Sequence, residues 1–193
     1  MRLNPHLRLP AALLLLLPPG SAAVVDRVAI VIGKQVVTES EVLDDLRLTE
    51  FIDNEPLDLA PAARRAAAEH LVDQELIRRE LEMSGYPKDS ASEADALLRK
   101  FRQSRFHALA EYRAAMRKYG IAEDQLKQRL LWQLSAIRFT DLRFGSQLPA
   151  AGSQSAGGTD ADASGSSVDR QMDAWLKQAR ADTKITLKPE AFQ

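Results

Sequence analysis

Histidine and cysteine are the residues that most often carry acid–base, nucleophilic or metal chemistry, and this chain has three histidines and no cysteine. His6 lies in an apolar leader, whereas His70 and His107 lie in separate predicted helices and lack the HExxH spacing of a zinc site. The absence of cysteine excludes a thiol nucleophile, a disulfide scaffold and a Cys-based zinc or iron–sulfur site. The sequence also contains no GxSxG nucleophile elbow, no P-loop and no dinucleotide-binding glycine motif.

Carboxylates are numerous, but most of them lie beside Lys or Arg in predicted helices, which is typical of solvated helix faces. One segment, 160–165, has oxygen-bearing side chains at alternate positions followed by glycine, as at the start of a calcium-binding loop. Gln171 stands where that loop needs a bidentate glutamate, so a plain linker is the better interpretation. We therefore expect no enzymatic activity, no cofactor and no metal ion.

Aromatic and methionine side chains at helical spacing are the remaining candidates for function. Side chains in this pattern most often form a protein core. They can also line a groove for apolar segments of another protein, because methionine and aromatic surfaces adapt to varied partners. The stretch 122–144 favours a groove, since it has leucines on one face and Trp132 and Phe139 on the opposite face. The candidate peptide-binding groove residues are Phe101, Tyr112, Met116, Trp132 and Phe139.

A hairpin and a helix are predicted at the start of the mature chain. The stretch 28–37 is mostly β-branched and is broken by Gly33, which suits a tight turn between two short strands. Thr38 and Glu41 form a capping box, which predicts a helix over about 39–52.

Three further helices follow in the central part of the chain. Pro61 suits the first turn of a second helix, whose apolar residues lie on several sides, as in a helix central to its domain. A second capping box, Ser90 with Glu93, predicts a third helix that runs to Tyr119. A fourth helix is predicted over about 122–144.

A linker separates the C-terminal segment from the helical body. In 146–167, 16 of 22 residues are Gly, Ser, Ala or Pro, which is too little apolar surface to fold. An amphipathic helix follows from Val168, and 184–187 alternates like a strand. An isolated helix of about 14 residues is marginal in water, so we expect this segment to dock back, with Ile185 and Leu187 pairing with the N-terminal strand. The predicted organisation is a signal peptide over 1–23, a helical core over 24–145, a flexible linker over 146–167, and a C-terminal helix and strand over 168–193 that complete the core.

The N-terminal segment has the order of a secretory signal. Arg2 and Arg8 precede the apolar run 9–17, and a Pro-Pro-Gly break and small residues follow. The run is shorter than the ~20 residues that span a bilayer. We expect cleavage near Ala23 and export to the periplasm; an uncleaved membrane-surface anchor is the alternative. Cleavage leaves 24 basic and 27 acidic side chains, a balance that does not favour nucleic acid as a partner.

Several segments, in order along the chain, resemble the SurA-type family of periplasmic chaperones and their parvulin-bearing relatives. The stretch 25–42 is similar to the family's opening hairpin and first core helix, and 69–77 to its central helix. The stretch 119–126 is similar to the start of a later helix. Residues 175–187 are similar to the terminal helix and strand of the family's chaperone core.

This resemblance implies a mainly α fold, a helical chaperone core with a small N-terminal β-hairpin joined by a C-terminal strand. It also implies a periplasmic chaperone that binds unfolded outer-membrane or secreted proteins without ATP. Many members carry a parvulin prolyl-isomerase domain before the terminal helix, but here only 146–167 stands at that place, well below the ~50 residues of a minimal domain. We therefore expect no prolyl-isomerase activity. The alternative is a dedicated adapter or assembly subunit that uses the same surface for one fixed protein partner.

Overall fold

A computed structural model describes residues 26–86, 90–145 and 160–193. The predicted signal peptide and the greater part of the predicted linker, 146–159, lie outside these residues. The described elements are β1 (Val28–Ile32), β2 (Gln35–Thr38), α1 (Glu39–Asp53), α2 (Pro61–Met83), α3 (Ala91–Arg105), α4 (Leu109–Tyr119), α5 (Glu123–Phe144), α6 (Asp160–Asp182), β3 (Ile185–Leu187) and a short 3-10 helix, η2 (Pro189–Phe192). The prediction of a mainly helical fold, with an N-terminal hairpin joined by a C-terminal strand, is confirmed.

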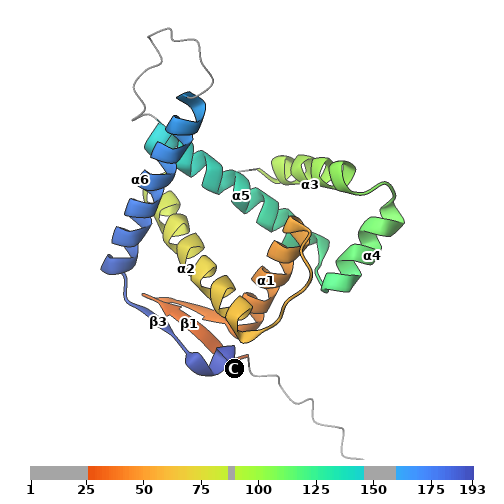
Figure 1. The fold of residues 1–193 in the computed structure, drawn as a ribbon, viewed down its shortest axis with the longest axis horizontal. Helices are drawn as coiled ribbons and strands as arrows, with labels where there is room; N and C mark the ends of the chain where they lie inside the picture. The colour runs from red at the N-terminus through yellow and green to blue at the C-terminus, as the bar shows by residue number, and fades with distance from the viewer. Residues whose placement is uncertain (1–25, 87–89, 146–159) are drawn as a thin grey trace, which may run out of the picture.

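The sheet lies at one end of α2 and unites the two ends of the described chain (Figure 1). Its strand order is β2-β1-β3, and both strand pairs are antiparallel. Ile30 pairs with Leu187, so the predicted pairing of the C-terminal strand with the N-terminal one is confirmed. Gly33 in the hairpin turn has a φ of +61°, and a side chain there would meet the Arg79 guanidinium at 3.1 Å. The positive φ therefore favours glycine, and any side chain there would also require the Arg79 guanidinium to shift by a few tenths of an ångström.

Local signals set where three of the helices begin. Thr38 and Glu41 close the predicted capping box of α1, where the Thr38 backbone N–H donates to the Glu41 carboxylate at 2.7 Å. Ser90 and Glu93 close the second one at α3, and Pro61 is the first residue of α2. Because these residues satisfy or remove backbone N–H groups that a helix start leaves free, the predicted helix starts are confirmed.

The predicted third helix is wrong in one respect, because the structure divides it into α3 and α4. Phe106 between them has an extended backbone, with φ −128° and ψ 132°. Its ring stacks on Phe51 at a centroid distance of 6.1 Å and meets Tyr112 edge-on at 5.4 Å. Arg105 Nη1 donates to the Phe51 carbonyl oxygen at 2.9 Å. The break directs the Phe106 ring toward an apolar cluster. The contacts of that ring with Phe51 and Tyr112 outweigh the helical pattern of the sequence.

The last helix begins earlier than predicted. The structure starts α6 at Asp160, so 160–167 is helical and the prediction of a linker there is wrong. The later turns of α6 are docked on the body, where Trp175 packs against α2 and α5 and Arg180 pairs with Asp73 at 2.6 Å. Once a helical turn is fixed, each further residue adds one hydrogen bond at little cost, so the docked turns extend the helix into the Ser- and Ala-rich stretch.

Three clusters of buried apolar residues hold the described elements together. The sheet cluster joins the strands to α1, α2 and η2. The aromatic cluster joins α1, α3, α4 and α5 around Phe51 and Tyr112. The α6 cluster joins α2, α5 and α6 around Phe139. Within the described ranges, no helix combines the length and apolarity that a membrane span requires.

Candidate functional site

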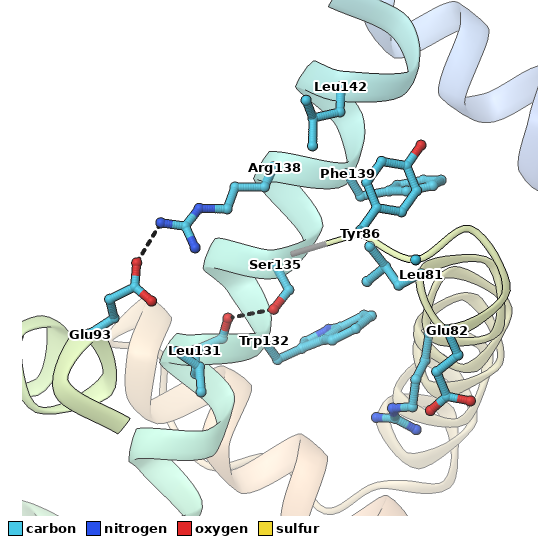
Figure 2. Close-up of a pocket in the computed structure, with 12 residues that line it drawn as sticks. Leu81, Glu82, Tyr86, Glu93, Leu131, Trp132, Ser135, Arg138, Phe139 and Leu142 are labelled. Carbon is cyan, nitrogen blue, oxygen red and sulfur yellow. Dashed lines mark hydrogen bonds and ion pairs between the residues drawn. The ribbon is translucent and has the colours of Figure 1, made fainter. Parts of the chain in front are cut away.

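A cleft of about 740 Å³ opens between α2 and α5, and we call it the apolar cleft. Its volume lies within the range of about 300–1,000 Å³ that is usual for ligand pockets. Figure 2 shows the α5 side chains projecting from one wall and those of the α2 end and its following turn from the other. The lining residues are Arg78, Leu81, Glu82, Gly85, Tyr86, Glu93, Leu131, Trp132, Ser135, Arg138, Phe139 and Leu142.

The floor of the apolar cleft is aromatic and is supported from behind. Phe139 is fully buried, and its ring packs against Tyr86 at 6.0 Å and against Trp175 at 5.2 Å. Trp175 belongs to α6, so the C-terminal helix forms the back of the floor. Trp132 is half-buried and extends from α5 toward α2, where the Arg78 guanidinium lies 5.3 Å from its ring (Figure 2). This packing fixes the floor before any ligand binds.

Three of the four charged residues that line the apolar cleft form ion pairs, namely Arg78, Glu93 and Arg138. Arg138 bonds to Glu93 at 2.6 Å, and Arg78 bonds to Glu75 at 2.8 Å. The hydrogen bond from Arg138, together with those from Ser90, lowers the pKa of Glu93 to about 2. The rim is thus charged but balanced, and the apolar floor lies between its charges.

One apolar side chain of the cleft is largely exposed to solvent. Leu142, which lines the cleft, is 55% exposed. A single exposed apolar side chain is ordinary, but at the edge of an open cleft it adds apolar surface that a partner can cover.

The five groove residues predicted from the sequence lie in two places. Trp132 and Phe139 belong to the apolar cleft. Phe101, Tyr112 and Met116 belong to the aromatic cluster, where Tyr112 is 1% exposed and Met116 is 7% exposed. The structure therefore brings two of the five to the apolar cleft, where Trp132 is half-buried and Phe139 is fully buried in the floor, and places the other three in or against a core.

Tyr112 has a structural partner inside the aromatic cluster. Its hydroxyl donates to Glu123 at 3.2 Å, and Tyr119 in the same cluster donates to the Glu55 carbonyl oxygen at 2.6 Å. Burial, together with the Glu123 carboxylate, raises the pKa of Tyr112 to about 12. This hydroxyl stays protonated at neutral pH and ties α4 to the start of α5.

Sequence reasoning missed Leu81, Tyr86, Leu131 and Leu142 as cleft residues. Tyr86 follows the end of α2, so no helical period includes it, and in the sequence it only marks a helix stop. The one available signal for Leu131 and Leu142 was the apolar character of α5 on two sides, which pattern analysis detects without showing which side stays open.

A second cleft, of about 280 Å³, adjoins the first and shares Arg78 and Trp132 with it. It is bounded by α1, α2 and α5 and by strand β2. We call it the acidic cleft, because four carboxylates and two guanidinium groups line it. These charged residues are Glu41, Asp44, Asp45, Glu75, Arg78 and Arg129.

Asp45 and Arg129 form a buried ion pair in the wall of the acidic cleft, with side chains 6% and 7% exposed. Arg129 Nη1 donates to Asp45 Oδ1, and Gln74 Nε2 donates to the same oxygen at 3.0 Å. His70 Nδ1 lies 3.5 Å from Asp45 Oδ2. Burial by itself raises the pKa of Asp45, but His70 and Arg129 outweigh burial and hold that pKa below its ordinary value. Together with Gln74 and His70 of α2, the pair joins α1, α2 and α5 beside the acidic cleft.

The described residues offer no group of three or more His, Asp or Glu side chains that could hold a metal ion. No protein-family model matches the chain, and no curated protein matches it significantly. The chemistry of the site therefore has to be inferred from its own geometry. An open cleft with a fixed aromatic floor and a charge-balanced rim is suited to bury apolar side chains of a partner.

Proposed function

We propose that this protein is a periplasmic chaperone that binds unfolded proteins through their apolar segments, without ATP. The observation that carries this proposal is the open apolar cleft, with Phe139 and Trp132 fixed in its floor and Leu142 exposed at its edge. Burying one leucine- or phenylalanine-sized side chain contributes roughly 1.5–3 kcal/mol. Much of that gain is offset by the entropy lost on association, so each contact is weak and release needs no energy source.

The client class and the compartment are supported by the sequence. The leader has the order of a secretory signal, and the resemblance to SurA-type chaperones implies unfolded outer-membrane or secreted proteins as clients. The order of elements, a hairpin, a helical body and a terminal helix with a strand, is the order that this resemblance implies. We further propose that the protein has no prolyl-isomerase activity, because the chain between α5 and α6 is far shorter than the ~50 residues of a minimal domain.

Aggregation of a denatured client tests the proposal. Residues 24–193 are mixed, without nucleotide, with a urea-denatured outer-membrane protein diluted into buffer, and light scattering is followed. We expect suppression of scattering near an equimolar ratio. Leu142→Gln should weaken suppression without unfolding the protein, because Leu142 lines the apolar cleft and is largely exposed. Leu109→Gln, which changes a leucine 45% exposed and outside both clefts, is the matched control.

A folded and monodisperse protein that fails to suppress aggregation would overturn the chaperone proposal. That outcome would favour the alternative, a dedicated adapter or assembly subunit that binds one fixed partner at the same cleft. Equal weakening by Leu142→Gln and by Leu109→Gln would show that suppression does not depend on the apolar cleft.

A further inference from the structure

The apolar cleft and the acidic cleft are adjoining halves of one surface. Arg78 and Trp132 line both clefts, and the contact between these two side chains marks the boundary. Residues of α2 and α5 line both halves. An extended polypeptide that fills one half can therefore continue into the other.

The two halves differ in charge. In the apolar cleft, two guanidinium groups stand against two carboxylates. In the acidic cleft, four carboxylates stand against two guanidinium groups, and both guanidinium groups already have carboxylate partners there. Arg129 is paired with Asp45, and Glu75 is paired with both Arg78 and Arg79. Arg79 lies outside the cleft lining, and its side chain is 30% exposed. Among the lining residues, the excess negative charge comes from the two remaining carboxylates, Glu41 and Asp44.

Both of these carboxylates are held in place by the fold. Glu41 closes the capping box of α1. Asp44 accepts a hydrogen bond from Gln125 of α5 at 2.9 Å. Arg47 also pairs with Asp44, at 3.2 Å, but its side chain lies outside the cleft lining and is 30% exposed. Water and salt therefore weaken the attraction by which Arg47 offsets the negative charge of Asp44. The acidic cleft therefore presents a fixed negative field beside an apolar binding surface.

We propose that the two clefts together bind unfolded segments in which apolar side chains are followed or preceded by a lysine or arginine. This inference rests on the proposed function and adds a charge preference to it. The apolar side chains occupy the apolar cleft, and the basic side chain crosses the boundary at Trp132 with its apolar stem and places its charge near Glu41 and Asp44. An acidic side chain at that place would meet like charges, so the surface selects against it.

Three peptides test the charge preference. They share one central apolar sequence and are flanked on both sides by Lys, by Gln or by Glu, so the result does not depend on binding direction. Binding to the mature chain at low salt is followed by fluorescence anisotropy. We expect the Lys peptide to bind about fivefold more tightly than the Glu peptide, with the Gln peptide between them, as is usual for partly exposed charge pairs. In about 0.5 M salt the difference should shrink, because the screening length falls to about 4 Å.

A paired substitution locates the preference. Glu41→Gln with Asp44→Asn removes two charges but keeps their hydrogen bonds, because Gln can complete a capping box and Asn can accept from Gln125. We expect this variant to bind the Lys and Glu peptides with affinities within about twofold of each other. Asp169→Asn with Asp173→Asn removes two exposed carboxylates of α6 outside both clefts and should keep the fivefold preference.

The outcomes separate this inference from the function on which it rests. Equal or reversed affinities for the Lys and Glu peptides would overturn the charge preference and leave the chaperone proposal standing. Loss of the preference in the Asp169 and Asp173 control would assign it to the net charge of the protein and would equally overturn the role of the acidic cleft. If no peptide binds and the denatured client still aggregates, the chaperone proposal itself is overturned, and this inference with it.

Discussion

Replacing Arg129 with methionine should destabilise the protein by about 3 kcal/mol, because it leaves a buried carboxylate without its cation. Asp45 would keep the donor from Gln74 at 3.0 Å and the His70 ring at 3.5 Å, but it is only 5% exposed and water cannot replace the lost charge partner. Removal of one partner of a buried pair costs about 3–5 kcal/mol. We expect the lower end of that range, since two polar neighbours remain.

The same pair makes the stability of the protein depend on pH. The pKa of Asp45 is lower in the folded protein than its ordinary value of 3.8, so ionisation of Asp45 favours the folded state. This contribution to stability is fully present above pH 3.8. It is lost as the pH falls through the lower pKa that Asp45 has in the folded protein. Without Arg129, the pKa of Asp45 should rise. The gap in stability between the variant and the natural protein should therefore narrow on acidification.

Urea unfolding followed by tryptophan fluorescence measures the effect at neutral pH and again near pH 3. The double variant Asp45→Asn with Arg129→Met should recover most of the loss, because replacing a buried pair by neutral groups is often close to neutral in stability. A loss below about 1 kcal/mol in the single variant would refute the reasoning. So would a double variant as unstable as the single one, since the uncompensated charge would then not be the cause.

Three other substitutions and one activity assay test separate parts of the structure and of the proposal. Arg180→Met removes the ion pairs with Glu69 and Asp73 that fasten α6 to α2, at 2.7 and 2.6 Å. We expect faster amide hydrogen exchange along α6 and a free energy of unfolding lower by about 1 kcal/mol. Unchanged exchange would mean that apolar packing alone docks the helix. Arg138→Met removes the largest cause of the low pKa of Glu93. The pKa of Glu93, measured by NMR titration, should therefore move from about 2 toward 4.5. An unchanged pKa would contradict the ion pair. Gly33→Val should lower stability by about 1–3 kcal/mol in thermal unfolding, because φ is +61° and the Arg79 guanidinium is in contact; an unchanged melting temperature would show that the turn can rearrange. Residues 24–193 should not accelerate cis–trans isomerisation of a proline-containing peptide, and turnover above the uncatalysed rate would contradict the proposed absence of this activity.

Much of the fold could be predicted because its signals are local. The capping boxes at Thr38 and Ser90 and the proline at the first residue of α2 each act within one helical turn. The alternation that predicts β3 reflects the two-residue period of a strand. The backbone N–H and C=O groups of an isolated strand need partners, and β1 supplies them in the pairing of Ile30 with Leu187.

Two predictions of secondary structure are wrong, and in both cases the cause is packing between distant parts of the chain. The chain breaks at Phe106 because that half-buried ring packs against Phe51 and Tyr112, partners that local pattern analysis does not connect. Residues 160–167 have a composition typical of a linker, but they continue a helix whose later turns are docked by Trp175. In both cases packing outweighs propensity, as tertiary context commonly does.

The candidate site was only partly accessible to sequence reasoning, for a different reason. Helical spacing shows that a side chain faces something apolar, but it does not distinguish a neighbouring helix from an open cleft. Tyr112 and Phe139 have the same kind of pattern and nearly the same burial, yet one lies inside the aromatic cluster and the other forms a cleft floor. Which of the two surfaces stays open depends on where α6 docks, and α6 comes from a distant part of the sequence.

The docking of α6 also explains why α5 is apolar on two sides. One side, with Leu126 and Leu130, packs into the aromatic cluster. The other carries Phe139, which Trp175 of α6 covers from behind while the cleft opens in front. The pairing of β3 with β1 anchors the C-terminal end of α6, so the two ends of the described chain cooperate to support that floor. The segment after the predicted linker is therefore not an appendage to the helical core, because without it the floor of the apolar cleft would lose its backing.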